Sequence, residues 1–132
     1  MKKALIAIFP LIFCFAAFAA PPAPMNHSGT WWQSKSIPFK SGFLSGYKDG
    51  QRRANPQAAY PTLDSRQIIQ GLDHFYKDFR NVNVQVEDAI LYVADELSGK
   101  SDADLAAELQ TLRKNAAAAA AKAPQSATED NE

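Results

Sequence analysis

The segment from Asp73 to Asn81 concentrates the side chains that could take part in chemistry or binding. It alternates aromatic with charged residues and carries one of the two histidines of the chain. On a helix, Asp73 lies one turn from Lys77, so the two can form an ion pair on the solvent side. His74 lies one turn from Asp78 in the same way. An imidazole beside a carboxylate offers two metal ligands, or a general acid and base.

The sequence nevertheless favours binding over catalysis. A metal site needs three or four ligands, and the second histidine, His27, lies in a separate part of the chain. No Gly-Xaa-Ser-Xaa-Gly turn accompanies His74 to supply a nucleophile. The sequence therefore predicts no catalytic residue, no metal and no cofactor. The alternative is a small hydrolase or ligand-binding domain that uses Asp73, His74 and Asp78.

Eight residues form the predicted binding surface: Tyr47, Asp49, Asp73, His74, Tyr76, Asp78, Arg80 and Asn81. Arg80 suits the negative C-terminal end of a helix, and Asn81 suits the left-handed turn that often follows one. The partner is expected to be another protein or a second copy of the chain. A nucleic acid is not expected, because 14 Lys and Arg are balanced by 14 Asp and Glu.

Two further patterns precede this segment. Gly42, Gly46 and Gly50 share one helical face, where each costs about 0.5 to 1 kcal/mol relative to alanine. Close packing of a neighbouring helix against that face would offset the cost, and a groove for a partner protein is the alternative. A phosphate-binding loop is the weakest reading, because no strand signal precedes the glycines and they lie within the helix. Trp31 and Trp32 either cap one end of a helical bundle or form an exposed anchor for a partner or glycan.

Apolar spacing predicts the helices that position these residues. The first covers about 38–53. The second covers about 63–79, capped by Thr62, and its apolar stripe is Ile68, Leu72, Phe75, Tyr76 and Phe79. It is the strongest periodic signal in the chain.

Two more helices follow. The third carries Val86 to Leu97 and is closed by Gly99, and the fourth opens at Ser101 to Asp104 in the manner of a capping box. Leu105, Leu109 and Leu112 form the apolar edge of the fourth helix. Only Val82 to Val84 resembles a strand. The predicted fold is therefore all-α, a small bundle of about four helices.

The first 19 residues have the organisation of a secretory signal peptide. Lys2 and Lys3 precede an uncharged run, and Ala17 to Ala19 offers small residues for cleavage. The run is short for a membrane span, so a retained anchor is the weaker alternative. Cleavage would remove Cys14, the only cysteine, and leave a formal charge of −2. We expect a periplasmic or secreted protein without disulfides and without a membrane contact after cleavage.

The rest of the chain divides by composition. Residues 20–36 contain three prolines and are predicted to form a flexible arm, and residues 37–114 form the helical domain. Residues 115–132 begin with an alanine run that is expected to extend the last helix before a disordered tail.

The order of these features resembles a known family. A signal peptide, the glycine-spaced segment Phe43 to Gly50 (FLSGYKDG) and an aliphatic second helix resemble Tai-like immunity proteins, which are small periplasmic proteins that bind type VI secretion amidase effectors. The segment Leu72 to Asn81 is also similar to small exported bacterial proteins of unknown role. The resemblance implies a helical protein-binding module, immunity- or inhibitor-like, that occupies a surface of its partner.

Overall fold

The computed structural model of the protein describes residues 26–56 and 64–122. Along the chain these form α1 (Gly29–Gln33), α2 (Ile37–Ala54), α3 (Ser65–Phe75), the 3-10 helix η1 (Phe79–Asn81), α4 (Val86–Leu97) and α5 (Asp102–Lys122). No strand occurs in these two ranges, and residues 82–84 form turns and a bend. The predicted all-α bundle is confirmed. The predicted signal peptide (1–19), the predicted cap Thr62 and the end of the predicted tail (123–132) lie outside the described residues.

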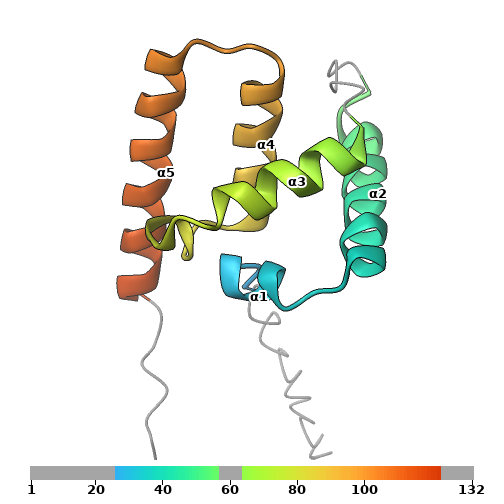
Figure 1. Cartoon of the computed structure of the whole chain (residues 1–132), viewed down its shortest axis with the longest axis horizontal. Coiled ribbons are helices and arrows are strands. Elements are labelled where there is room, and N and C mark those ends of the chain that lie inside the picture. Colours follow the sequence, from blue (N-terminus) through green and yellow to red (C-terminus); the bar gives the residue numbers. More distant parts are fainter. Residues whose placement is uncertain (1–25, 57–63, 123–132) are drawn as a thin grey trace, which may run out of the picture.

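Helix α3 is the centre of the arrangement. It contacts α2 and α4, and α4 also contacts α5. Figure 1 shows α3 crossing α4 obliquely, with α2 beside the start of α3, α5 alongside α4, and the short α1 below α3. The end of α3 and η1 reach the flank of α5. This crossing brings the Asp73 to Asn81 segment against two other parts of the chain.

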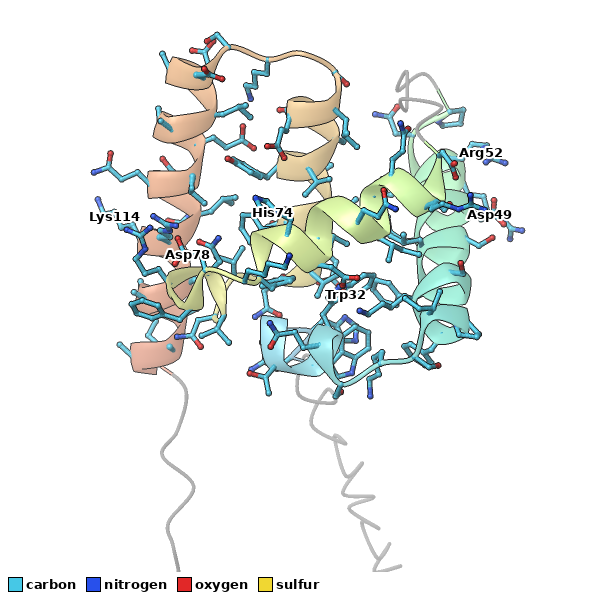
Figure 2. All side chains as sticks on the ribbon, viewed as in Figure 1. Trp32, Asp49, Arg52, His74, Asp78 and Lys114 are labelled. Carbon is cyan, nitrogen blue, oxygen red and sulfur yellow. The ribbon has the colours of Figure 1, made fainter. Side chains whose placement is uncertain are left out.

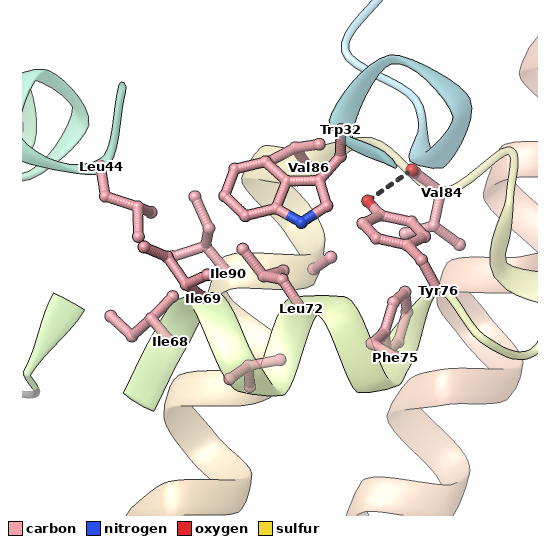
Figure 3. Close-up of a cluster of buried hydrophobic side chains, with 12 residues drawn as sticks. Trp32, Leu44, Ile68, Ile69, Leu72, Phe75, Tyr76, Val84, Val86 and Ile90 are labelled. Carbon is pink, nitrogen blue, oxygen red and sulfur yellow. Dashed lines mark hydrogen bonds between the residues drawn. The ribbon is translucent and has the colours of Figure 1, made fainter. Parts of the chain in front are cut away.

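The core lies where α3 faces α4. Both helices are amphipathic at helical spacing, so each buries one stripe of apolar residues against the other. The fully or almost fully buried side chains from these helices are Ile68, Ile69, Leu72 and Phe75 on α3, and Val86, Ala89, Ile90 and Val93 on α4. Figure 3 shows Trp32 of α1 and Leu44 of α2 extending this cluster. Leu97, at the end of α4, is 41% exposed.

The second predicted helix ends four residues early. Helix α3 stops at Phe75, and Phe79, predicted on its apolar stripe, is 81% exposed. Asp78 caps the following η1 by accepting a hydrogen bond from the backbone N–H of Arg80 at 3.0 Å. Side chains of this type offer the backbone an alternative to the α-helix, which explains the early end. At the other end of α3, Asp64 is the N-cap and accepts from Arg66 N–H at 3.0 Å.

Residues 26–36 differ from the predicted flexible arm. Gly29–Gln33 form α1, and Trp32 has no exposed surface. Backbone hydrogen bonds fasten the segment to the chain before α4, from Gly29 N to Val82 O at 2.8 Å and from Val86 N to His27 O at 2.7 Å. Gly29 allows this approach, because a Cβ there would lie 2.4 Å from Cδ1 of the Tyr76 ring.

The turn between α4 and α5 follows the prediction closely. Gly99 has a positive φ of 83° after the C-cap Ser98. Its N–H donates to Glu96 O, and that of Lys100 donates to Asp95 O, which is the Schellman arrangement. Ser101 then accepts from Asp104 N–H at 3.2 Å and donates to its carboxylate at 2.7 Å.

The glycine strip of α2 faces open space. A Cβ at Gly42, Gly46 or Gly50 would meet nothing within 4 Å. The predicted close packing of a neighbouring helix against this face is therefore wrong for the described part of the chain. Leu44 and Lys40, on the opposite side of α2, are the residues of this helix that become buried.

Since nothing occupies the space beside Gly46, Gly46→Ala is expected to raise the free energy of unfolding by about 0.5 to 1 kcal/mol. Gly71→Ala is the matched control, because its Cβ would lie 2.4 Å from Cγ1 of the fully buried Val93. We expect that variant to lose about 1 kcal/mol or more. Urea unfolding followed by circular dichroism measures both. A loss of stability in Gly46→Ala would contradict an open face on α2.

Candidate functional site

The eight predicted binding residues fall into separate places. Asp49 is exposed on α2, where it pairs with Arg52 at 3.4 Å. Tyr47 is half-buried against the core. Figure 2 shows Asp49 and Arg52 on α2, at the opposite end of α3 from His74 and Asp78. The predicted surface is therefore not continuous.

Asp73 belongs to the junction between α1, α2 and α3. The predicted ion pair with Lys77 does not form. Instead, Lys40 Nζ donates to Asp73 Oδ1 at 2.7 Å and Trp32 Nε1 donates to the same oxygen at 2.8 Å. The Lys40 ammonium also lies 5.0 Å from the Trp32 ring centroid. Because Lys40 is only 6% exposed, a long-range partner within the fold displaces the local pair.

Tyr76 is a core residue rather than a surface contact. It is 2% exposed, and its hydroxyl donates to Val84 O at 3.0 Å, the bond drawn in Figure 3. Burial raises the pKa of the Tyr76 phenol, and the nearby carboxylates of Glu87 and Asp88 raise it further. Its own backbone oxygen accepts from Gln33 Nε2 at 2.9 Å. Tyr76 therefore remains protonated and holds α1 and the chain after η1 in place.

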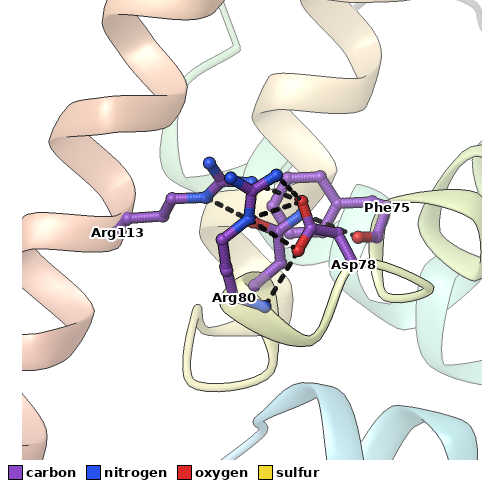
Figure 4. Close-up of polar contacts among 5 residues, drawn as sticks. Phe75, Asp78, Arg80 and Arg113 are labelled. Carbon is purple, nitrogen blue, oxygen red and sulfur yellow. Dashed lines mark hydrogen bonds and ion pairs between the residues drawn. The ribbon is translucent and has the colours of Figure 1, made fainter.

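Asp78, Arg80 and Arg113 form a charged network between η1 and α5 (Figure 4). The Asp78 carboxylate accepts from Arg80 Nε at 2.9 Å, from the second Arg80 nitrogen at 2.6 Å and from Arg113 at 2.8 Å. Hydrogen bonds from Arg80, followed by the charge of both guanidiniums, hold the pKa of Asp78 far below its usual range. Asp78 is therefore ionised and bound to two arginines, in place of the predicted contact with His74.

Asn81 anchors the same turn from inside. It is 3% exposed, its side-chain amide donates to Phe75 O at 2.7 Å, and its oxygen accepts from Arg113 Nε at 2.8 Å. Non-glycine residues with positive φ are absent from the described ranges, so the predicted left-handed conformation of Asn81 is wrong. Its amide closes the end of α3 without that conformation.

The result is a rigid turn that presents one aromatic side chain. Phe79, at 81%, is the most exposed of the large hydrophobic residues described. Asp78 and Asn81, which flank it, are both fixed to Arg113 of α5. We call Lys77 to Asn81, together with Arg113, the Phe79 turn. Of the predicted site residues, Asp78, Arg80 and Asn81 meet here.

Sequence reasoning missed Arg113 and the exposure of Phe79. Arg113 lies one helical turn after Leu109, beside the apolar edge of α5, and is half-buried. That position is a weak signal for a residue directed at the core side of its helix. Its partner, the cap residue of η1, could not be identified from spacing, because 35 residues separate Arg113 from Asp78.

A pocket of about 190 Å³ adjoins the Phe79 turn. Its lining includes the exposed His74, the charged Asp78, Glu96 and Arg113, and the half-buried Tyr92. Asp73 instead lines a different pocket, of about 490 Å³, between α2 and α3. Asp73, His74 and Asp78, the three residues of the hydrolase alternative, therefore do not line one pocket.

The described ranges offer neither a metal site nor a membrane span. No group of three or more His, Cys, Asp or Glu side chains is placed to hold a metal ion in them. None of their helices is long and apolar enough to cross a membrane. Both Asp78 oxygens already accept from guanidiniums, which leaves the carboxylate poorly placed to act as a base.

A scan against protein-family models, a search of curated proteins and a search of solved structures each find no match to this chain.

Proposed function

We propose that this chain is a protein-binding module whose contact with its partner is centred on Phe79. The observation that carries the proposal is the 81% exposure of this side chain on a turn fixed from both sides. Burying a phenylalanine stabilises by about 1.5 to 3 kcal/mol. The isolated chain does not obtain this stabilisation, because the ring stays in water. A complex in which the partner encloses Phe79 would obtain it.

The rigidity of the turn supports the same proposal. Binding is weakened when loops and side chains must be ordered at the interface. Here Asn81 and Asp78 already hold the backbone on both sides of Phe79, through Phe75 O and Arg113. The backbone of the turn would therefore lose little further freedom on binding. Aromatic residues presented in this way are typical of the few positions that dominate an interface.

The location and class of the module belong to the same proposal. The amino-terminal sequence has the three parts of a secretory signal peptide, so we place the protein in the periplasm or outside the cell. The pattern-level resemblance to immunity proteins of type VI secretion amidases favours an inhibitor-like role. In that role the module acts by covering part of its partner.

Phe79→Ala tests the proposal. The wild-type protein, immobilised and exposed to a periplasmic extract of its source, is expected to retain a partner that Phe79→Ala retains at least about 30-fold less, because a central aromatic contributes about 2 kcal/mol or more to binding. Urea unfolding of Phe79→Ala should match the wild type, since the ring makes little contact with the fold.

Leu91→Ala is the control, because Leu91 is a 47% exposed apolar residue on α4. It should retain the partner as the wild type does. Equal retention by wild type and Phe79→Ala, or no retained protein at all, would contradict the proposed function.

A further inference from the structure

We infer that the Phe79 turn recognises a partner protein through an apolar pocket rimmed by carboxylates. This inference rests on the proposed function and adds the chemistry of the partner surface to it. Phe79 supplies the apolar part, and the charges around it supply the rest.

The Asp78 network carries more positive than negative charge. One carboxylate serves two guanidiniums, and it accepts hydrogen bonds on both of its oxygens. Asp78 is thus already satisfied. Arg80 keeps 61% of its side chain exposed, and three of the five N–H groups of a guanidinium remain after its two donating nitrogens each use one. These donors lie one residue from Phe79.

Lys77 adds a second exposed cation beside Phe79. Its ammonium forms no hydrogen bond or ion pair with the described residues, and it lies in the turn after α3, two residues before Phe79. Among the acidic residues, Glu96 lines the same pocket as Asp78 and Arg113. Lys77, Arg80 and Arg113 carry three positive charges, and Asp78 and Glu96 carry two negative charges, so these five groups of the turn and its pocket have a net charge of +1.

The small number of these charges and their grouping around one ring favour a protein as the partner over a polyanion. Nucleic-acid surfaces require an extended basic stripe that meets several phosphates, and the whole chain has no net charge. Here the basic groups are few and are grouped around an aromatic ring. A guanidinium edge matches the two oxygens of a carboxylate, whereas the phenyl ring requires an apolar pocket. Both are available together on a protein surface.

Lys77→Glu tests the charge part of the inference. With the protein retained by the wild-type chain as the probe, we expect Lys77→Glu to weaken binding about tenfold or more at low ionic strength. Arg66→Glu is the matched control, because it makes the same charge change at an exposed position at the start of α3. It should bind within about twofold of the wild type. Raising the salt concentration should weaken wild-type binding and remove most of the difference between the two variants.

The outcomes separate this inference from the proposed function. A partner that depends on Phe79 but binds Lys77→Glu as tightly as Arg66→Glu, or more tightly than the wild type, would overturn the inference alone. Sedimentation of the pure chain gives a second check: Phe79-dependent self-association would make the partner a second copy and would also overturn it. If the wild-type chain retains no partner, both proposals are contradicted.

Discussion

Trp32→Ala is expected to lower the free energy of unfolding by about 3 to 5 kcal/mol, the range measured when buried aromatic residues are truncated. Trp32 has no exposed surface, and its indole donates to Asp73 and lies beneath the Lys40 ammonium. Truncation would leave a cavity and would also remove one partner of the Asp73 carboxylate. Urea unfolding followed by circular dichroism measures the loss.

Trp31→Ala is the matched control for this prediction. Trp31 is half-buried, and its ring packs against that of His27 in a tilted arrangement with 4.3 Å between ring centroids. The Trp31→Ala variant should therefore lose clearly less unfolding free energy than Trp32→Ala. If Trp32→Ala does not fold, Trp32→Phe still tests the assignment, because it keeps most of the apolar volume and loses the hydrogen bond to Asp73. Equal stability of the wild type and Trp32→Ala would show that α1 does not enter the core.

Asn81→Ala is expected to lower the free energy of unfolding by about 2 to 3 kcal/mol, because it leaves the buried Phe75 oxygen and the Arg113 Nε–H without their partner. It should also weaken partner binding beyond the loss in folded fraction, because the turn that holds Phe79 becomes less ordered. Thermal unfolding and the retention experiment measure the two effects separately.

Asn83→Ala provides the comparison for Asn81. Asn83 is exposed on the same connection, and its side chain forms no hydrogen bond with the described residues. Its replacement should change stability by less than about 0.5 kcal/mol. If the two variants lose the same stability, the buried amide of Asn81 does not fix the turn.

The helices were predictable because their signals are local. The apolar stripes of α3 and α4 and the cap residues Gly99 and Ser101 act within a few residues of themselves. Helix α1 was not predictable in this way. It is five residues long, and long-range bonds to Val82 and Val86 hold its segment in place.

The candidate site shows the same limit. Spacing paired Asp73 with Lys77 and His74 with Asp78, since residues four apart share a helix face. In the fold, the buried Lys40 and the arginine on α5 provide stronger partners for the two carboxylates. A partly buried charge pairs with whichever opposite charge the fold places beside it. The separation of the two residues in the sequence does not identify that partner. Spacing did identify the segment itself, because Asp78, Arg80 and Asn81 all belong to the Phe79 turn.

The open glycine face of α2 has no structural explanation within the described residues. Gly42, Gly46 and Gly50 each forgo helix stability, yet no neighbouring atom approaches them. The gain in unfolding free energy expected for Gly46→Ala therefore equals the helix stability that glycine forgoes at this position and that no packing contact restores.

The central claim is that Phe79 contacts a partner protein, and photo-crosslinking at that position tests it most directly. p-Benzoylphenylalanine placed at position 79 is expected to give a covalent adduct with a second protein on irradiation of the source cells. The same group at position 91, on the exposed side of α4, should not give that adduct. An adduct from position 79 alone is the result that the account predicts, and no adduct from position 79, or the same adduct from both positions, would contradict it.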